Sequence, residues 1–362
     1  MGKELIYIGV LSLGAYLFLK KPKEKFSDYL NDVEVLFDGF RVKEVAKSGL
    51  SPIKNTKKYH YNPDDGAVFD SDDGGWIYVS NSENGDFKGG VGALKFNSNG
   101  KLIDYYMILE NTNRNCSGGK TQFNTWLSCE EYDRGKVYEC DPLKKKLTRS
   151  YDNMGIFSHE SAAVDPKTNI VYLTEDDENG LIYRYLPSGD LEAACRGDQS
   201  KVIWNKVDPK KVPVRYQVKN GLRNNKWEGC VYHPDGYIYF VESRKGIFRY
   251  NIENNTLKMF YRSNRNGIVD KLNSPDNICL TPNNNLLVTE DPGGYWNDYL
   301  ELWIINHKTK KSFPFLRVHN HNGSELTGAS FTKDGKRLYF SSQRGKDGKG
   351  ITYEVSGDFS SF

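Results

Sequence analysis

From about residue 60 onward the chain repeats one arrangement of apolar and polar positions. In each copy an apolar stretch of strand length runs into a polar, usually acidic, residue. The six stretches are Trp76–Glu83, Trp126–Glu130, Ile170–Glu175, Tyr237–Glu242, Leu286–Glu290 and Leu338–Gln343. Their ends recur at intervals of 45 to 67 residues, which indicates one structural unit copied six times.

Two further elements keep their place in most copies of the repeat. A polar residue precedes a short apolar stretch upstream of the strand, and a hairpin follows the strand. The upstream positions are Cys116, Glu160, Glu228, Asp276 and Thr327. Asn-Gly, Asp-Gly, Pro-Asp and Asn-Asn pairs supply the turns. Four short strands per unit predict an all-β fold, a six-bladed β-propeller over residues 27–362, in preference to a β-sandwich.

Two departures from the regular spacing are expected to shape the ring. The step of 67 residues contains an insertion at about 187–225, rich in Lys and Asn, which we expect on the surface. The last hairpin ends near Phe359, so the final blade is expected to lack a strand. Residues of the segment 33–60 are expected to supply that strand and close the ring.

The N-terminal segment has a different pattern. Leu5–Leu19 is an uncharged apolar run of 15 residues with lysines on both sides and no small-residue cleavage site after it. We predict a short N-terminal hydrophobic helix within residues 1–26, a single-pass membrane anchor lengthened by snorkelling lysines, with a buried core helix as the alternative. The lysines after the run favour a body on the cytoplasmic side, although the side of the membrane stays open.

Charge and motif content exclude several classes of function. Lys+Arg 50 against Asp+Glu 47 gives a net charge of +3, so no bulk basic field is present to bind nucleic acid. Six scattered cysteines are too few for a disulfide scaffold. The sequence contains no CxxC pair, no GxxxxGK[ST] and no GxGxxG, which excludes zinc-ribbon, P-loop and Rossmann sites.

The recurring acids are the strongest chemical signal in the sequence. In a propeller the strands nearest the axis converge on a central channel, and the two recurring positions are expected at its mouth. That set comprises Glu83, Glu130, Glu160, Glu175, Glu228, Glu242, Asp276 and Glu290, together with Cys116. Like charges at such distances repel, so multivalent cations are expected among them. Carboxylates suit Ca²⁺, Mg²⁺ or Mn²⁺, whereas the Cys116 thiolate suits iron better than calcium.

Four strings of the sequence carry a family resemblance. They are NCSGGKTQFNTWLSCEE (115–131), FSHESAAVDPKTNIVYLTEDD (157–177), WEGCVYHPDGYIYF (227–240) and SPDNICLTPNNNLLVTEDPGG (274–294). In their residues and in their order along the chain, these strings resemble the PhoX family of alkaline phosphatases. The resemblance implies a six-bladed propeller that holds iron and calcium in its channel and hydrolyses phosphate monoesters. The expected cofactors are therefore Ca²⁺ and Fe³⁺, and the expected nucleophile is a water or oxo group.

The resemblance also assigns roles to single residues. It makes Cys116 an iron ligand, and Glu83, Glu175 and Glu228 carboxylate ligands. Glu130 or Glu131, Glu160, Asp276 and Glu290 are implied as calcium or shared ligands. The family's usual phosphate-binding Arg lies two residues before the WEGC-type Glu, where this chain has Lys226. Lysine keeps the charge but loses the bidentate fork, for which Arg223 or Arg244 is a possible replacement. The implied catalytic set is Lys226, Glu228 and Cys116.

Two other functions stay open at the level of the sequence. A non-catalytic, metal-stabilised propeller could serve as a membrane-associated binding or assembly platform, because fold alone does not fix function. A calcium-dependent lactonase or esterase is the third reading. Such sites rely on one Glu with several Asn and Asp, and Asn81 and Asn277 are available for it.

Overall fold

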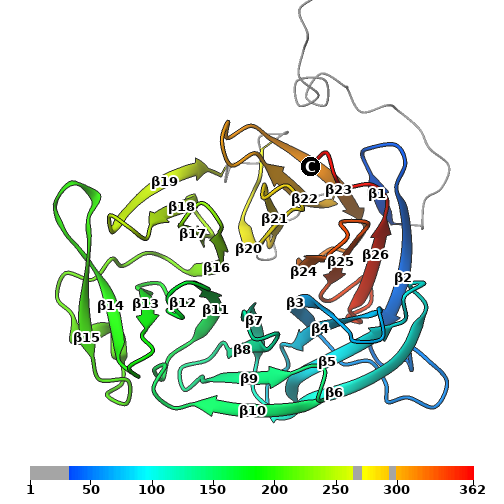
Figure 1. The fold of residues 1–362 in the computed structure, drawn as a ribbon, viewed down its shortest axis with the longest axis horizontal. Helices are drawn as coiled ribbons and strands as arrows, with labels where there is room; N and C mark the ends of the chain where they lie inside the picture. The colour runs from blue at the N-terminus through cyan, green and yellow to red at the C-terminus, as the bar shows by residue number, and fades with distance from the viewer. Residues whose placement is uncertain (1–31, 264–270, 293–298) are drawn as a thin grey trace, which may run out of the picture.

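Six antiparallel sheets surround one axis in the computed structural model, which describes residues 32–263, 271–292 and 299–362 (Figure 1). Each sheet is one blade of a propeller. The first strand of a blade lies nearest the axis and the later strands follow outwards to the rim. This arrangement confirms the predicted all-β, six-bladed β-propeller.

The first three blades use the chain in sequence order. Blade 1 contains β3 (Pro63–Asp70), β4 (Trp76–Ser82), β5 (Gly89–Phe96) and β6 (Leu102–Thr112). Blade 2 contains β7 (Asn115–Lys120), β8 (Trp126–Glu130), β9 (Val137–Asp141) and β10 (Lys146–Tyr151). Blade 3 contains β11 (His159–Val164), β12 (Val171–Glu175), β13 (Ile182–Tyr185), β14 (Leu191–Arg196) and, outside it, β15 (Val202–Val207).

The last three blades complete the ring. Blade 4 contains β16 (Trp227–His233), β17 (Tyr237–Glu242), β18 (Gly246–Asn251) and β19 (Thr256–Arg262). Blade 5 contains β20 (Pro275–Leu280), β21 (Leu286–Glu290), β22 (Tyr299–Ile305) and β23 (Ser312–His319). Blade 6 contains β24 (Leu326–Phe331), β25 (Arg337–Ser342) and β26 (Ile351–Ser356).

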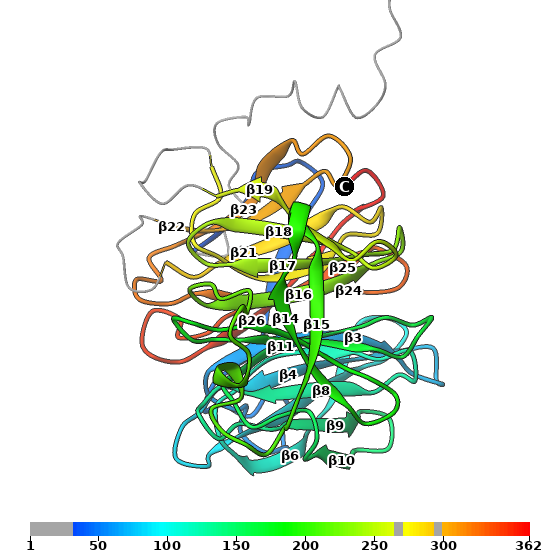
Figure 2. The same cartoon turned by 90° about the vertical axis from the view of Figure 1, so that its left-hand side faces the viewer.

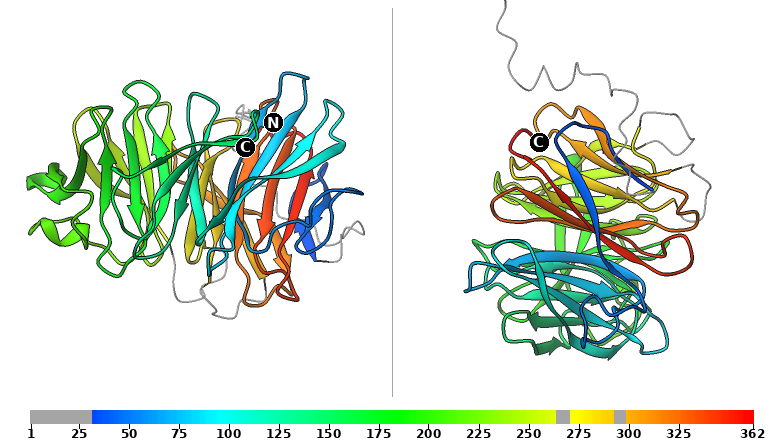
Figure 3. Two further views of the ribbon diagram at one scale, coloured as in Figure 1. Left: turned by 90° about the horizontal axis from the view of Figure 1, so that it is seen from below. Right: turned by 90° about the vertical axis from the view of Figure 1, so that its right-hand side faces the viewer.

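The N-terminal strands close the ring by joining the last two blades. β2 (Arg41–Lys47) pairs with β26 and becomes the fourth strand of blade 6, so the predicted closure by the segment 33–60 is confirmed. β1 (Val33–Val35) pairs with β23 and adds a fifth strand to blade 5. The right-hand view of Figure 3 shows this N-terminal part, in blue, lying against the C-terminal strands, in red.

The extra residues between blades 3 and 4 begin later than 187. Leu191–Arg196 is the regular fourth strand β14, and the added part starts after it with the 3₁₀ turn η1 (Asp198–Ser200). Strand β15 and a second turn, η2 (Val214–Gln217), follow. Figure 2 shows β14 and β15 running together along the rim of the molecule. The insertion is therefore an outer extension of blade 3.

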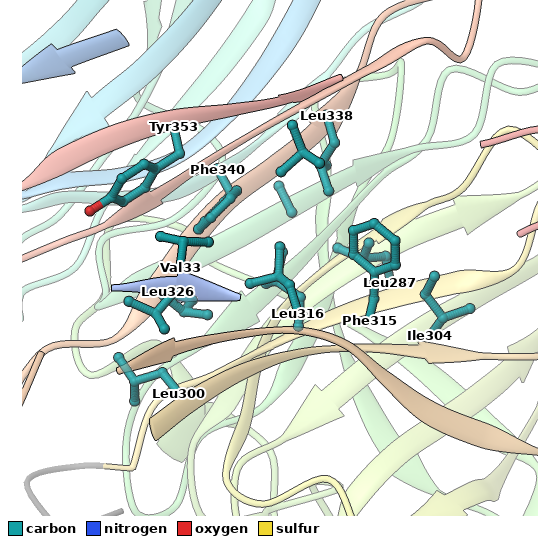
Figure 4. Packing of buried hydrophobic residues seen from close by; sticks show 14 of the residues in the cluster. Val33, Leu287, Leu300, Ile304, Phe315, Leu316, Leu326, Leu338, Phe340 and Tyr353 are labelled. Carbon is teal, nitrogen blue, oxygen red and sulfur yellow. The ribbon is translucent and has the colours of Figure 1, made fainter. Parts of the chain in front are cut away.

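Hydrophobic side chains fill each gap between neighbouring blades. Six core clusters are found in the described residues, and each one combines two adjacent blades. Figure 4 shows the cluster between blades 5 and 6, where Val33, Leu316 and Phe340 meet. Truncating one such buried Leu to Ala typically costs about 2–5 kcal/mol. Inter-blade packing thus fixes the rotation of each blade relative to the next.

The inner strands approach one another too closely for ordinary side chains. A Cβ atom on Gly119 of β7 would lie 1.9 Å from the carbonyl oxygen of Ala162 in β11. Only glycine allows this contact, because it brings the backbones of blades 2 and 3 together near the axis. The residues at the ends of these strands are held correspondingly close.

The predicted anchor within residues 1–26 lies outside the described residues. In residues 32–263, 271–292 and 299–362, no helix is long and apolar enough to cross a membrane. The short N-terminal helix is therefore no part of the described fold.

Candidate metal centre

The second residue of each inner strand lies at one mouth of the central channel. These residues are Asp64, Cys116, Glu160, Glu228, Asp276 and Thr327. Except for Asp64, they are the upstream positions predicted from the repeat. Asp64 belongs to the same series through the Pro-Asp pair in NPDDG, which matches the Pro-Asp of SPDN in blade 5. That shared pair is the signal that could have found Asp64.

A β-bulge follows the start of each inner strand. In β7, for example, Cys116 and Ser117 together oppose the single residue Cys129 of β8. The same shift occurs at the equivalent place in β3, β11, β16 and β20, and one residue later in β24. A bulge bends a strand and redirects its side chains. In this protein each inner strand therefore bends close to its start, next to the residues at the channel mouth.

A second set of polar residues comes from the chain that leaves the second strands. The set comprises Glu83, Glu131, Asp176, Ser243, Asp291 and Gln343, each one residue beyond the partner of an inner-strand start. Glu325, immediately before β24, joins them. Nine carboxylates of the described residues therefore belong, together with Cys116, to one cluster. Asp64, Glu160, Glu228, Asp276 and Glu325 are buried, and the other four are half-buried.

The strand register separates the acids that the sequence pattern treated alike. Glu83, Glu131 and Asp176 occupy equivalent positions in their blades. Glu130, Glu175 and Glu290 lie one residue before that position. Because side chains alternate along a strand, a shift of one residue turns a carboxylate to the other side. The structure places Glu83, Glu160, Glu228 and Asp276 with Cys116 in the cluster; it does not bring Glu130, Glu175 and Glu290 there.

Glu130 and Glu290 bind backbone amides instead. Glu130 accepts hydrogen bonds from the amides of Asn113 (2.8 Å) and Lys136 (3.1 Å). Glu290 accepts from the amides of Asn273 (2.8 Å) and Glu301 (3.0 Å). With both oxygens engaged, these side chains hold the loops that flank the second strand of each blade.

Glu175 has a third kind of environment. It accepts hydrogen bonds from the Leu181 amide (3.1 Å) and the Tyr183 hydroxyl (2.8 Å), and Arg215 of the insertion lies 2.6 Å away. Its charge is therefore balanced within blade 3 and the insertion.

Three groups of potential ligands within the cluster have their donor atoms within 4.8 Å of one another. The groups are Cys116–Glu131–Glu160, Glu160–Asp176–Glu228 and Asp64–Glu83–Glu325. Glu160 belongs to two of them, so its carboxylate lies between adjacent ligand sets. The three groups contain residues of every blade except blade 5. The blade 5 carboxyls Asp276 and Asp291 are close enough to Glu228 and Glu325 for their charges to repel.

Burial and mutual repulsion perturb the acids of the cluster. Burial, together with Glu83, raises the pKa of Asp64 well above its ordinary value. Burial and Glu228 do the same to the pKa of Glu160, and burial and Glu160 to the pKa of Glu131. The pKa values of Glu228, Asp276 and Glu325 are raised for the same reasons. Without a cation these carboxylates cannot all be ionised at once.

Cys116 lies among these acids. Its Sγ lies 3.3 Å from a Glu160 oxygen and 3.6 Å from an Asp64 oxygen. Burial, followed by the charges of Asp64 and Glu160, raises the pKa of the Cys116 thiol well above its usual range. A metal ion bound at the sulfur would favour the thiolate in these surroundings.

Two cationic side chains border the cluster on different sides. Lys226 Nζ lies 2.9 Å from Asp176 Oδ2, and Arg344 Nη1 lies 2.9 Å from Glu325 Oε1. Burial lowers the pKa of Lys226, but Asp176 and Glu228 outweigh that effect and raise it above its usual value. Arg223, considered as a replacement for the family's Arg, donates to the carbonyls of Arg215 and Val218 in the insertion. Arg344 is the arginine that sequence reasoning missed.

Lys226 is held in an uncommon backbone conformation. Its φ is +60°, and the residues at the same place before three other inner strands, Asn62, Arg114 and Ser274, have φ values of +46°, +50° and +44°. Non-glycine residues rarely adopt this left-handed region, and they do so mainly where the surroundings enforce it. The backbone therefore fixes the direction from which Lys226 approaches the cluster.

The residues present fit a group of bound cations. Among the described residues, the set offers nine hard carboxylates and one thiol, with Lys226 and Arg344 as cations at its border, so acidic groups outnumber these two cations. In addition, Asp176 Oδ1 is buried without a hydrogen-bond partner among the described residues. Carboxylate oxygens in such a number suit Ca²⁺, and a thiol beside two glutamates suits iron.

The amides considered for a lactonase site are occupied within the fold. Asn81 Nδ2 donates to the carbonyls of Cys116 (2.8 Å) and Ser117 (2.9 Å), and its Oδ1 accepts from Trp126 and Ser128. Asn277 donates to Ser117 Oγ (3.0 Å) and accepts from the Gly328 amide. Both amides support the inner strands beneath the cluster.

Comparison with known proteins connects this centre with one family. The family model described as alkaline phosphatase PhoX matches residues 132–204, a segment that includes Glu160 and Asp176. A search of curated proteins found no match.

Solved structures share the fold. PhoX from Pseudomonas fluorescens in complex with vanadate, described as a transition state analogue, has 13% identity and a TM-score of 0.76, with 91% of this chain and 96% of that chain covered. A gluconolactonase from Xanthomonas campestris has 10% identity and a TM-score of 0.52 over 88% of this chain and 90% of that one. A luciferin-regenerating enzyme has 11% identity and a TM-score of 0.53 over 88% and 96%.

Two comparisons point to PhoX, and the family-model match contains one of the four strings, residues 157–177. One comes from a family model and the other from a fold that extends over nearly the whole of both chains. The family model thereby confirms the resemblance of this chain to the PhoX family of alkaline phosphatases over residues 132–204, and the structural match shows the shared fold.

Proposed function

We propose that the chain is a metal-dependent phosphatase that hydrolyses phosphate monoesters at the mouth of its central channel. The observation that carries the proposal is the convergence of nine carboxylates and Cys116 on one site between two cationic side chains. The match to the PhoX family supports the same reaction class.

The chain's own residues divide into three metal-holding groups under this proposal. Cys116, Glu131 and Glu160 would hold iron, because this group contains the thiol. Glu160, Asp176 and Glu228 would hold one calcium ion, and Asp64, Glu83 and Glu325 another. When bound, such ions polarise phosphoryl oxygens and make a coordinated water more acidic. Glu130, Glu175 and Glu290 have structural roles in this assignment.

Lys226 and Arg344 would bind the phosphoryl group of the substrate. A phosphate monoester is dianionic near neutral pH, and the two cations border the carboxylate cluster on different sides. Arg344 offers the planar fork that suits phosphate oxygens, whereas Lys226 offers a compact charge. Together they would orient the substrate and stabilise the charge that develops on its oxygens. Arg344 thus supplies the guanidinium that the Lys226 position lacks.

We also propose that the chain associates with a membrane, and this part of the proposal is based on the sequence alone. It rests on the Leu5–Leu19 run, and alkaline carbonate extraction of cell membranes tests it separately from catalysis.

Metal analysis of the Cys116→Ala variant tests the proposed reaction. The purified full chain is expected to contain both iron and calcium and to hydrolyse p-nitrophenyl phosphate. In the variant, iron and hydrolysis should be lost together, because the sulfur is the soft ligand of the iron group. Cys279→Ala is the matched control, since Cys279 lies at the other end of an inner strand.

The other outcomes favour the other functions. Bound iron and calcium without hydrolysis of any monoester would favour a metal-stabilised binding platform. Calcium without iron, unaffected by the substitution, would contradict the phosphatase and favour a calcium-dependent lactonase or esterase.

A further inference from the structure

Two histidines and an aspartate meet on the face of the ring opposite the carboxylate cluster. Strand β16 begins at the cluster with Glu228 and ends at His233, so His233 and the following Asp235 lie at the far face. His307 follows β22, which starts near the cluster face and ends at Ile305. His233 and Asp235 belong to blade 4 and His307 to blade 5. The three residues therefore form a contact between neighbouring blades.

The distances between their polar atoms are those of a small ligand set. Asp235 Oδ2 lies 3.5 Å from His307 Nε2 and 3.8 Å from His233 Nδ1, and one donor atom from each residue lies within 4.8 Å of the others. Zn–N and Zn–O bonds of about 2.0–2.2 Å in a tetrahedral site place ligand atoms about 3.3–3.5 Å apart. The two Asp235 distances are thus within a few tenths of an ångström of those in a tetrahedral site, and the two histidine nitrogens lie within 4.8 Å of each other.

The second nitrogen of each histidine is bonded in the way that metal-binding histidines require. His233 Nε2 lies 3.0 Å from the Asn284 carbonyl oxygen, and His307 Nδ1 lies 3.3 Å from Asn285 Oδ1. Because both partners are acceptors, these ring nitrogens carry the protons. His233 Nδ1 and His307 Nε2 are then the unprotonated ring nitrogens, and both lie next to Asp235. A ring N–H donated to a carbonyl is the usual outer contact of a metal-bound histidine.

The exposure of the group also suits a metal ion. The side chains of His233 and His307 are 1% and 12% exposed, whereas the Asp235 side chain is 57% exposed, so the group is open to solvent on the Asp235 side. The Asp235 amide donates to His233 Nδ1 at 3.1 Å, and metal would displace this bond. Asp235 is exposed, so water can take over the amide.

We propose that His233, Asp235 and His307 bind a divalent transition metal of the zinc type, which joins blade 4 to blade 5 on the far face of the ring. Three protein ligands leave the fourth tetrahedral position to water. The site is separate from the carboxylate cluster and prefers a different class of metal, because nitrogen donors select zinc over calcium.

Titration with Zn²⁺ tests the proposal on the full chain. The protein is kept in millimolar Ca²⁺ so that the carboxylate cluster is filled, and Zn²⁺ binding is followed by calorimetry. The parent is expected to bind one Zn²⁺ that His307→Gln and Asp235→Asn lose or bind at least ~10-fold more weakly. With Co²⁺ as the probe, the parent should show the visible absorption of a tetrahedral site, and the variants should not.

His319→Gln is the matched control. His319 Nε2 lies 3.0 Å from a Glu34 oxygen, a histidine–carboxylate pair that belongs to no three-residue ligand group in the described part of the chain. This variant should bind Zn²⁺ as the parent does. The proposal is overturned if the parent binds no Zn²⁺ under these conditions, or if His307→Gln and Asp235→Asn both keep the parent's stoichiometry and affinity. Asp235 is exposed, so at least this variant is expected to fold.

Discussion

At the scale of single residues, acids that follow one another in the sequence perform different tasks. Blades 2, 3 and 5 each end their second strand with two acids, in the pairs Glu130–Glu131, Glu175–Asp176 and Glu290–Asp291. The first acid of each pair binds groups of its own blade, its loop or the insertion, and the second lies in the cluster. The alternation of side chains along an extended chain is the physical reason.

This division predicts opposite effects for neighbouring substitutions. Glu131→Gln should lower metal content and reduce kcat/KM for p-nitrophenyl phosphate by about 100-fold, because one charged ligand is lost. Glu130→Gln should keep the metals and most of the activity. It should cost about 1–3 kcal/mol of stability, since an NH₂ group would then face a backbone amide donor. Elemental analysis, kinetics and urea unfolding of both variants measure these effects.

Equal loss of metal in the two variants would contradict the register-based assignment. Loss of metal in Glu130→Gln alone would reverse it, and would return Glu130 to the ligand role first inferred from the sequence.

Part of the site could be predicted from the sequence. The rest depends on the strand register, which the sequence pattern does not reveal. Cys116, Glu160, Glu228 and Asp276 were found because they start inner strands at a constant spacing. The second set was aligned by its acids, which matched Glu83 with Glu130. Alignment by residue pairs, Ser82–Glu83 with Glu130–Glu131, gives the observed register. Glu325 and Arg344 carry no repeat signal, because blade 6 lacks acids at the equivalent positions.

At the scale of elements, the insertion is attached to blade 3 through a nearly buried arginine. Arg215 of η2 binds Glu175 at 2.6 Å and Asp177 at 2.7 Å, and only 14% of its side chain is exposed. Glu175 is fully buried, so Arg215 supplies most of the charge that allows Glu175 to ionise there. The rim extension and the inner part of the blade are thus coupled.

Removal of this arginine is expected to destabilise the protein strongly. Arg215→Ala should lower the free energy of unfolding by about 3–5 kcal/mol, because Glu175 would be left buried without its partner. Lys206→Ala is the comparison within the same insertion, since Lys206 is 70% exposed and pairs with Asp190 at 2.6 Å. That change should cost no more than about 1 kcal/mol. Urea unfolding compares them, and similar costs would argue against a buried ionic attachment.

The start of the insertion was placed too early for a physical reason. Strand β14 has the sequence LEAACR, which has no β-branched or aromatic residue to mark it as a strand. Its position is determined by pairing on both sides, with β13 and with β15. Tertiary pairing of this kind leaves no local signal. The regular strands, by contrast, were predicted because their apolar residues recur with each blade.

At the scale of the whole molecule, the carboxylate cluster links stability to pH and to metal. Acids whose pKa is raised on folding hold protons that the unfolded chain has already released. The folded state then binds more protons than the unfolded state, so its stability falls as pH rises through the raised pKa values. Within the cluster, Asp64 and Glu160 have pKa values raised well above the ordinary range. Burial also raises the pKa of two carboxyls outside the cluster, Asp65 to about 7 and Glu290 to about 8, so the pH dependence extends across neutrality.

We therefore expect the metal-free protein to lose stability with increasing pH. In EDTA the melting temperature should fall between pH 6.5 and pH 8.5, whereas in Ca²⁺ it should be higher and depend less on pH. Bound cations replace the protons, because metal ligands must be deprotonated. Scanning calorimetry at several pH values gives both curves. A melting temperature in EDTA that rises across this range would be the contrary result.

Buried histidines set the lower limit, pH 6.5, of the range in which stability should fall with rising pH. Burial lowers the pKa of His60 to about 3 and the pKa values of His159 and His321 to about 4. These groups are neutral when folded and gain protons on unfolding below about pH 6.5, so they make stability rise with pH there. Above pH 6.5 their contribution is constant, and the carboxylates determine the slope.

The ring closure also sets an order of events in folding. Arg41 pairs with Ser356 and Lys47 with Ile351, so β2 cannot find its partner until the last blade has been synthesised. At roughly 5–20 residues per second, translation leaves β2 unpaired for tens of seconds. Its sequence, RVKEVAK, places charges at four of seven positions, which protects an unpaired strand from pairing with other chains. The strand that closes the propeller can therefore stay unpaired, with little risk of aggregation, until the last blade has been synthesised.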